Sequence, residues 1–247
     1  MKELLRFSAV TLFPEMFETI KSEGVIAKAI KKNIIQLETV YLRDFADNIR
    51  KNVDDKPIGG GDGMVLRPDI TEKAILSVKT DATFIINLTP SGKVFNNSIA
   101  KNIAKKSHVL LLCGRYAGYD ARVIAKHAHL NLSIGDFVLS GGELPAMCFI
   151  DTVARFVPGV LGNQLSAELD SFENGLLEAP QYTHPENFSG MKAPDILFSG
   201  NHKKISDFTR KEQLKITAQN RPDLILEHWD SLSRQEKVLV EKIWKFS

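Results

Sequence analysis

Short runs of consecutive apolar residues alternate with helical patterns between residues 68 and 156. The runs lie at 83–88, 108–113 and 130–134, and helical patterns come before, between and after them. A strand that is apolar at every position is buried on both faces, which is typical of a parallel sheet with helices on each side. We therefore expect an α/β fold, to which the apolar run at 7–13 adds another buried strand.

A chain of 247 residues is long enough for two domains, and its amino-acid composition and periodicity change near residue 160. Residues 160–203 are rich in Gly, Pro, Asn and Ser without clear periodicity, which is typical of a linker or a mobile segment. Helical patterns then return, and Ser233 with Glu236 forms a capping box before the last helix. We predict an α/β domain at 1–160, a flexible linker at 161–175 and a small all-α domain at 176–247.

Loops follow the three central strands at 89–92, 114–118 and 132–145. Ligands bind at the carboxyl ends of strands in parallel sheets, so the three loops are expected to meet at one site. Three glycines in the third loop, Gly135, Gly141 and Gly142, lack a Cβ atom and let backbone groups approach a bound molecule. The glycines alone fit equally well with an ordinary strand, turn and helix; the convergence of three loops is what favours a ligand site.

An earlier stretch from 43 to 69 is long and polar, and most of its residues 59–63 are glycine. A loop of this length inside a compact domain is usually functional or disordered. A merely flexible connection fits the glycines equally well.

Composition and motifs exclude several classes of protein. The 32 basic and 30 acidic residues give a net charge of +2, so a nucleic-acid partner would be recognised by local patches. The chain lacks both a dinucleotide-binding glycine fingerprint and a P-loop. Cys113 and Cys148 each lie in an apolar run and are expected in the core. Without a signal peptide or an apolar run of membrane-spanning length, the protein is expected to be soluble and cytoplasmic.

Several motifs in one order match a known family. They lie at 12–17, 59–64, 113–116, 133–146, 154–162, 170–172 and 199–202. Through them the chain resembles, along nearly its whole length, the bacterial tRNA (guanine-N1)-methyltransferases of the SPOUT class, which methylate guanosine 37 beside the anticodon.

The resemblance implies a deep trefoil knot in the α/β domain, an exception to the rule that chains do not thread loops. It also implies a pocket for S-adenosylmethionine at the strand-end loops. The residues implied to bind this cofactor are Leu88, Thr89, Pro90, Gly114, Tyr116, Gly118, Ser133, Ile134, Gly135, Phe137, Leu139, Gly141, Gly142 and Pro145. Family precedent makes Mg²⁺ dependence plausible, but no residue of the chain is assigned as a metal ligand.

Two residues carry over from the family as catalytic. Asp170 would act as the general base that removes the guanine N1 proton, and Arg155 would stabilise the charge that develops on O6. Without the resemblance, Asp170 would be interpreted as a solvated surface acid, and Arg155 as a helix-end cation that counters the helix dipole.

The family's partners are tRNA, through its anticodon stem-loop, and a second copy of the chain that shares the active site; no membrane or DNA partner is implied. The residues implied to bind tRNA are Gly59, Ser171, His184, His202 and Lys211. The chain departs from the family pattern at Ala117, at His184 and in segment 205–209, which lacks the usual arginines. The alternative function is a knotted module that binds S-adenosylmethionine and RNA or a partner without turnover.

Overall fold

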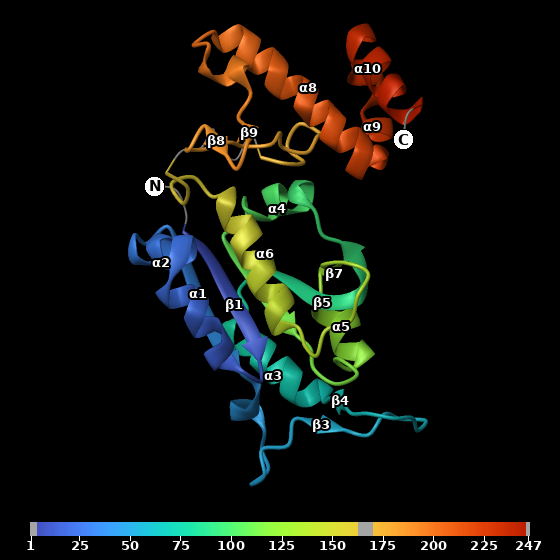
Figure 1. Ribbon diagram of the computed structural model, residues 1–247. Helices are drawn as coiled ribbons and strands as arrows, with labels where there is room; N and C mark the ends of the chain where they lie inside the picture. Colours follow the sequence, from blue (N-terminus) through green and yellow to red (C-terminus); the bar gives the residue numbers. More distant parts are fainter. Residues whose placement is uncertain (1–3, 163–169, 246–247) are drawn as a thin grey trace. The chain divides into compact units, whose positions relative to one another are not determined.

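The computed structural model describes residues 4–162 and 170–245. The chain divides into two compact units, residues 1–162 and residues 163–247 (Figure 1). Much of the linker predicted at 161–175, namely 163–169, lies outside the described residues.

The first unit contains a five-stranded parallel sheet, as the apolar runs predict. Its strand order is β2-β1-β6-β5-β7, and every neighbouring pair is parallel. The strands are β1 (Leu5–Thr11), β2 (Ile35–Tyr41), β5 (Thr83–Val94), β6 (His108–Cys113) and β7 (Leu130–Ser133). Because β6 lies at the centre and all its residues are buried, it needs apolar side chains on both faces.

Helices cover both faces of this sheet. Val109 and Leu111 of β6 pack in one apolar cluster with α2 (Gly24–Lys31), α4 (Asn97–Ile103) and α6 (Glu143–Arg155). Leu110 and Leu112 pack in a second cluster with α3 (Pro68–Val78) and α5 (Ala121–His127). Consecutive residues of a strand point to opposite faces, so the two clusters are the two sides of one sheet. Shorter helices are η1 (Pro14–Phe17), α1 (Glu18–Ser22) and η2 (Leu42–Phe45).

The loop predicted at 89–92 is in fact part of β5. Leu88 and Lys93 both align with Leu132 of β7, so the residues between them bulge out of the ladder. A Cβ atom on Gly92 would collide with the backbone of Leu132, which is why a glycine is needed here. The sequence prediction ended the strand at Leu88 because its apolar run stops there, but pairing with β7 resumes after the bulge.

The long polar stretch from 43 to 69 contains a small antiparallel hairpin. Its strands are β3 (Asp54–Asp55) and β4 (Val65–Leu66). Leu66 is fully buried, and its backbone N–H donates to the carbonyl of Gly118 at 2.9 Å. The base of this hairpin is therefore attached to the loop that follows β6.

The second unit is mainly helical, as predicted, and also holds a short hairpin. Its helices are α8 (His202–Asn220), α9 (Pro222–Glu227) and α10 (Arg234–Lys245), with short turns η3 (Asp195–Phe198) and η4 (Trp229–Ser231). The hairpin pairs β8 (Asn187–Phe188) with β9 (Met191–Lys192). The capping box is confirmed: Ser233 N donates to Glu236 Oε2 at 2.8 Å, and Glu236 N donates to Ser233 Oγ at 3.4 Å.

One of the two expectations for the cysteines was wrong. Cys113 is buried as predicted, but Cys148 is exposed. The buried residues of α6 include Ala146, Phe149, Ile150 and Val153, which follow helical spacing, and Cys148 faces away from them. Within the stretch 160–203, Leu176 is only 3% exposed and packs in the core of the second unit.

Candidate active site

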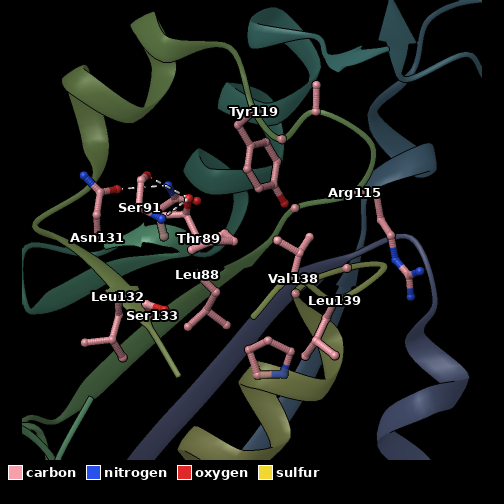
Figure 2. Close-up of a pocket in the computed structure, with 18 of the residues that line it drawn as sticks. Leu88, Thr89, Ser91, Arg115, Tyr119, Asn131, Leu132, Ser133, Val138 and Leu139 are labelled. Atoms are coloured by element: carbon pink, nitrogen blue, oxygen red, sulfur yellow. Dashed lines mark hydrogen bonds between the residues drawn. The ribbon is translucent and has the colours of Figure 1, made fainter. Parts of the chain in front are cut away.

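A cavity of about 580 Å³ lies beside the bulge of β5 and the carboxyl ends of β6 and β7 (Figure 2). Its walls come from the bulge of β5, from the loop 114–118 and from the loop that joins β7 to α6. The volume is typical of a site for a small organic molecule. The three strand-end segments of the sequence prediction therefore converge, as expected for a parallel sheet.

The structure brings most of the predicted cofactor residues to this cavity. All of them except Gly135 line it: Leu88, Thr89, Pro90, Gly114, Tyr116, Gly118, Ser133, Ile134, Phe137, Leu139, Gly141, Gly142 and Pro145. Gly135 instead shapes the loop, since its N–H donates to Ser133 Oγ at 3.2 Å and its carbonyl accepts from that hydroxyl at 2.9 Å. A Cβ atom on Gly135 would lie 2.5 Å from the ring of Phe137.

Further residues that line the cavity are not among the cofactor residues implied by the resemblance. Three come from α5, where Ala121, Ile124 and Ala125 have the spacing of one helical face. That apolar face is visible in the sequence, but only the topology shows that it borders the cavity. Others are Asn87, Ser91, Arg115, Ala117, Tyr119, Asn131, Leu132, Val138 and Ser140.

The cavity wall is largely uncharged. Figure 2 shows Leu88, Tyr119 and Val138 around its centre. Tyr119 is 9% exposed, and burial raises the pKa of its phenol well above the usual value, so this ring is a neutral, mainly apolar wall. Across the described residues, Arg115 is the only charged side chain that lines the cavity.

The loops after β6 and β7 are in direct backbone contact. The N–H of Gly142 donates to the carbonyl of Gly114 at 2.8 Å. A Cβ atom on Gly142 would lie 2.6 Å from the Cα atom of Cys113, a separation that no side chain tolerates. This glycine is therefore required by close packing of the two loops that frame the cavity.

A buried ion pair joins the same two loops. Arg115 Nε donates to Glu143 Oε2 at 2.8 Å, and the Glu143 side chain is fully buried. Thr11 Oγ1 donates to the other carboxylate oxygen at 2.8 Å. Arg115 also donates to the carbonyl of Ser140 at 3.2 Å, and its guanidinium points away from Leu88 and Tyr119 (Figure 2). The pair thus ties both loops to β1.

Replacing Glu143 with glutamine should lower the unfolding free energy of the first unit by about 2–3 kcal/mol, because the Arg115 charge would lose its buried partner. Both tryptophans lie in the second unit, so hydrogen exchange at β6 peptides in increasing urea is the suitable measurement. The matched control is Glu18→Gln, which breaks the exposed pair with Lys21 and should cost less than about 1 kcal/mol. Equal losses in the two variants would contradict the role of the buried pair.

The predicted catalytic residues lie in different units. Arg155 is exposed and is the last residue of α6 in the first unit. Asp170 is half-buried and starts a turn in the second unit. Each of these two residues interacts with another residue.

The predicted tRNA-binding residues do not form one cluster. Gly59 lies in the loop between β3 and β4, and its φ of +92° suits glycine. Ser171 accepts a hydrogen bond from the N–H of Glu178 at 2.9 Å, so its hydroxyl closes a turn. His202 and Lys211 are both exposed on α8 but lie roughly two and a half turns apart, on opposite faces. The last of the set, His184, is exposed and precedes the β8–β9 hairpin.

Two kinds of feature are absent from the described residues. No three His, Cys, Asp or Glu side chains in 4–162 and 170–245 gather closely enough to hold a metal ion. Within the same ranges, every helix is too short or too polar to span a membrane.

Residues 5–227 match the family model described as tRNA (Guanine-1)-methyltransferase TrmD. Similar proteins carry the name tRNA (guanine-N(1)-)-methyltransferase. The one from Dictyoglomus turgidum is 47% identical over 242 residues, which cover 98% of each chain. The one from Geobacillus kaustophilus is 46% identical over 226 residues, or 91% of this chain and 93% of its own. The one from Clostridioides difficile is 45% identical over 224 residues, or 89% and 97%.

Proposed function

Because the chain belongs to the tRNA (guanine-1)-methyltransferase family, we propose that it transfers the methyl group of S-adenosylmethionine to N1 of guanosine 37, in tRNAs with guanosine at position 36. The observation that carries this proposal is the similarity over almost the full length of both chains. The trefoil knot implied by the SPOUT class belongs to the same proposal. Since tRNA is the substrate, the reaction would take place in the cytoplasm.

The cavity residues fit S-adenosylmethionine. The apolar walls at Leu88, Leu132 and Tyr119 suit an adenine ring, and the glycine loops bring backbone groups to the edge of the cavity. The bound cofactor would supply an electrophilic methyl group on a positively charged sulfur. The cavity wall would not repel this positive charge, because the Arg115 guanidinium is already neutralised by Glu143.

The catalytic steps assigned to the chain's own residues are proton removal and charge stabilisation. The Asp170 carboxylate takes the proton from guanine N1, which frees an electron pair on N1 to accept the methyl group. The Arg155 guanidinium stabilises the negative charge that develops on O6 as the proton leaves. Alignment of N1 with the donor supplies much of the remaining rate enhancement.

The two units would divide the remaining tasks. We propose that residues 1–160 bind the cofactor, that 161–175 link the two domains and that 176–247 bind the anticodon stem-loop. We also propose a homodimer in which Asp170 of one copy acts at the cavity of the other. A fully active monomer in sedimentation would contradict that arrangement.

The proposed function predicts methyl transfer to a specific nucleotide. Unmodified tRNA transcript with guanosine at positions 36 and 37 should take up tritium from labelled S-adenosylmethionine, and nuclease digestion should yield 1-methylguanosine. Transcripts with adenosine at position 36 or at position 37 should take up at most background label. Uptake that persists without guanosine 37 would reject the position, and binding of the native transcript without uptake would favour the non-catalytic module.

A further inference from the structure

Asp170 begins a turn, residues 170–178, that is closed by its own hydrogen bonds. The N–H of Phe172 donates to the carbonyl of Leu176 at 2.8 Å. The N–H of Glu178 donates to Ser171 Oγ at 2.9 Å, which ties the residue next to Asp170 to the far end of the turn. The direction of the Asp170 side chain therefore depends on the shape of the whole turn.

The turn is attached to α8 within the same unit. Leu176 packs in the apolar cluster that includes Leu214 of that helix. The N–H of Leu177 donates to Thr217 Oγ1 at 2.9 Å, and Thr217 is fully buried. The Thr217 hydroxyl also donates to the carbonyl of Gln213 at 2.6 Å, which fixes the orientation of its lone pairs toward the turn.

Two further contacts restrict the turn to one conformation. Gly175 has a φ of +71°, and a Cβ atom there would collide with the imidazole of His228. Phe172 has a φ of +75°, a conformation that large side chains rarely adopt. Its ring lies under the Arg221 guanidinium, 5.8 Å from ring centroid to Cζ. Such a backbone persists only where the surroundings hold it in place.

We propose that Thr217 is a positioning residue for Asp170, acting through the turn 170–178. The inference rests on the proposed function, in which Asp170 is the general base. Without the Thr217 hydroxyl, the Leu177 N–H would lose its hydrogen-bond partner, and the closed turn would compete with other conformations. A base that is out of line with N1–H removes the proton more slowly. The second unit would thus orient the catalytic carboxylate as well as bind tRNA.

The test compares Thr217→Val with Thr217→Ser in the full-length protein. Thr217→Val keeps the side-chain shape but loses the hydroxyl, and we expect the single-turnover rate of methyl transfer to fall about tenfold. The dissociation constant for S-adenosylmethionine should stay unchanged in calorimetry, and amide exchange at 171–178 should become faster. Thr217→Ser, which keeps the hydroxyl, should restore both the rate and the protection.

Thr71→Val is the matched control. Thr71 is also fully buried and also donates to the carbonyl four residues earlier, that of Arg67 at 2.8 Å, but it lies on α3 in the first unit. Loss of the Thr71 hydroxyl should leave the single-turnover rate of methyl transfer unchanged. If Thr217→Val fails to fold, Gly175→Ala displaces the same turn by pushing against His228 and should give the same pattern of effects.

A double-mutant cycle with Asp170→Asn separates the positioning role of Thr217 from the role of Asp170 as general base. If Thr217 acts through Asp170, then Thr217→Val should not lower the residual rate of Asp170→Asn any further. A further tenfold loss in that background, or a looser turn with a normal rate, would overturn the role of Thr217. Full activity of Asp170→Asn alone would instead reject Asp170 as the base, which is a failure of the proposed function.

Discussion

Replacing Asp170 with asparagine is expected to lower the single-turnover rate of methyl transfer by about 10² to 10⁴, the usual contribution of a general base. The amide has nearly the shape of the carboxylate but cannot take up the N1 proton. The hydrogen bonds that the N–H groups of Phe172 and Glu178 donate to close the turn do not involve the Asp170 side chain, so the turn should stay in place. The rate should be measured with saturating S-adenosylmethionine and enzyme in excess over tRNA.

The control for this variant is Asp230→Asn. Asp230 lies on an exposed turn of the same unit, so this variant makes the same chemical change away from the site and should keep a rate within about twofold. The affinity of Asp170→Asn for S-adenosylmethionine should equal that of the unaltered protein, because the cavity belongs to the first unit. A rate close to normal would remove Asp170 as the base.

Local patterns were sufficient to predict the sheet. Every residue of β6 is apolar or buried, and that run alone indicates a central parallel strand. The bulge in β5 was not predictable, because it depends on where Leu132 of β7 pairs after the interruption. Register of this kind is decided by the partner strand, which no local pattern contains.

The second unit shows the same limit. Residues 170–178 have the composition of a linker, yet the burial of Leu176 and the hydroxyl of Thr217 hold them in one conformation. Thr217 follows Leu177 by 40 residues, so the contact exists only once α8 has formed. The exposure of Cys148 likewise depends on which face of α6 meets the sheet.

The loops that form the cavity were predictable, but the ion pair that holds them together was not. Glycines and strand ends indicated three loops, whereas the pair of Arg115 and Glu143 joins residues 28 positions apart. Glu143 stands in the sequence as one acidic residue at the start of a helix, a position where acids are ordinary. Only its complete burial shows that it holds the cavity walls together.

Replacing Gly142 with valine should weaken binding of S-adenosylmethionine by about 100-fold. The new Cβ atom would lie 2.6 Å from Cys113 Cα and 2.9 Å from Gly114 N, so backbone must shift where the cavity loops cross. Overpacking a rigid contact costs about 1–3 kcal/mol, and each 1.4 kcal/mol of lost binding free energy is tenfold in affinity. Because valine would press a branched side chain against rigid backbone, we expect its cost to lie at the upper end of that range.

Gly141→Val is the informative comparison for this variant. A Cβ atom on Gly141 meets the side chain of Arg115 rather than backbone, and that side chain is able to move at the cost of its bond to Glu143. We therefore expect a smaller loss of affinity than for Gly142→Val. Gly162→Ala, where a Cβ atom meets nothing within 4 Å, should bind S-adenosylmethionine normally. Calorimetric titration of the three variants ranks them, and unaltered binding in Gly142→Val would mean that the cofactor is held somewhere other than between these loops.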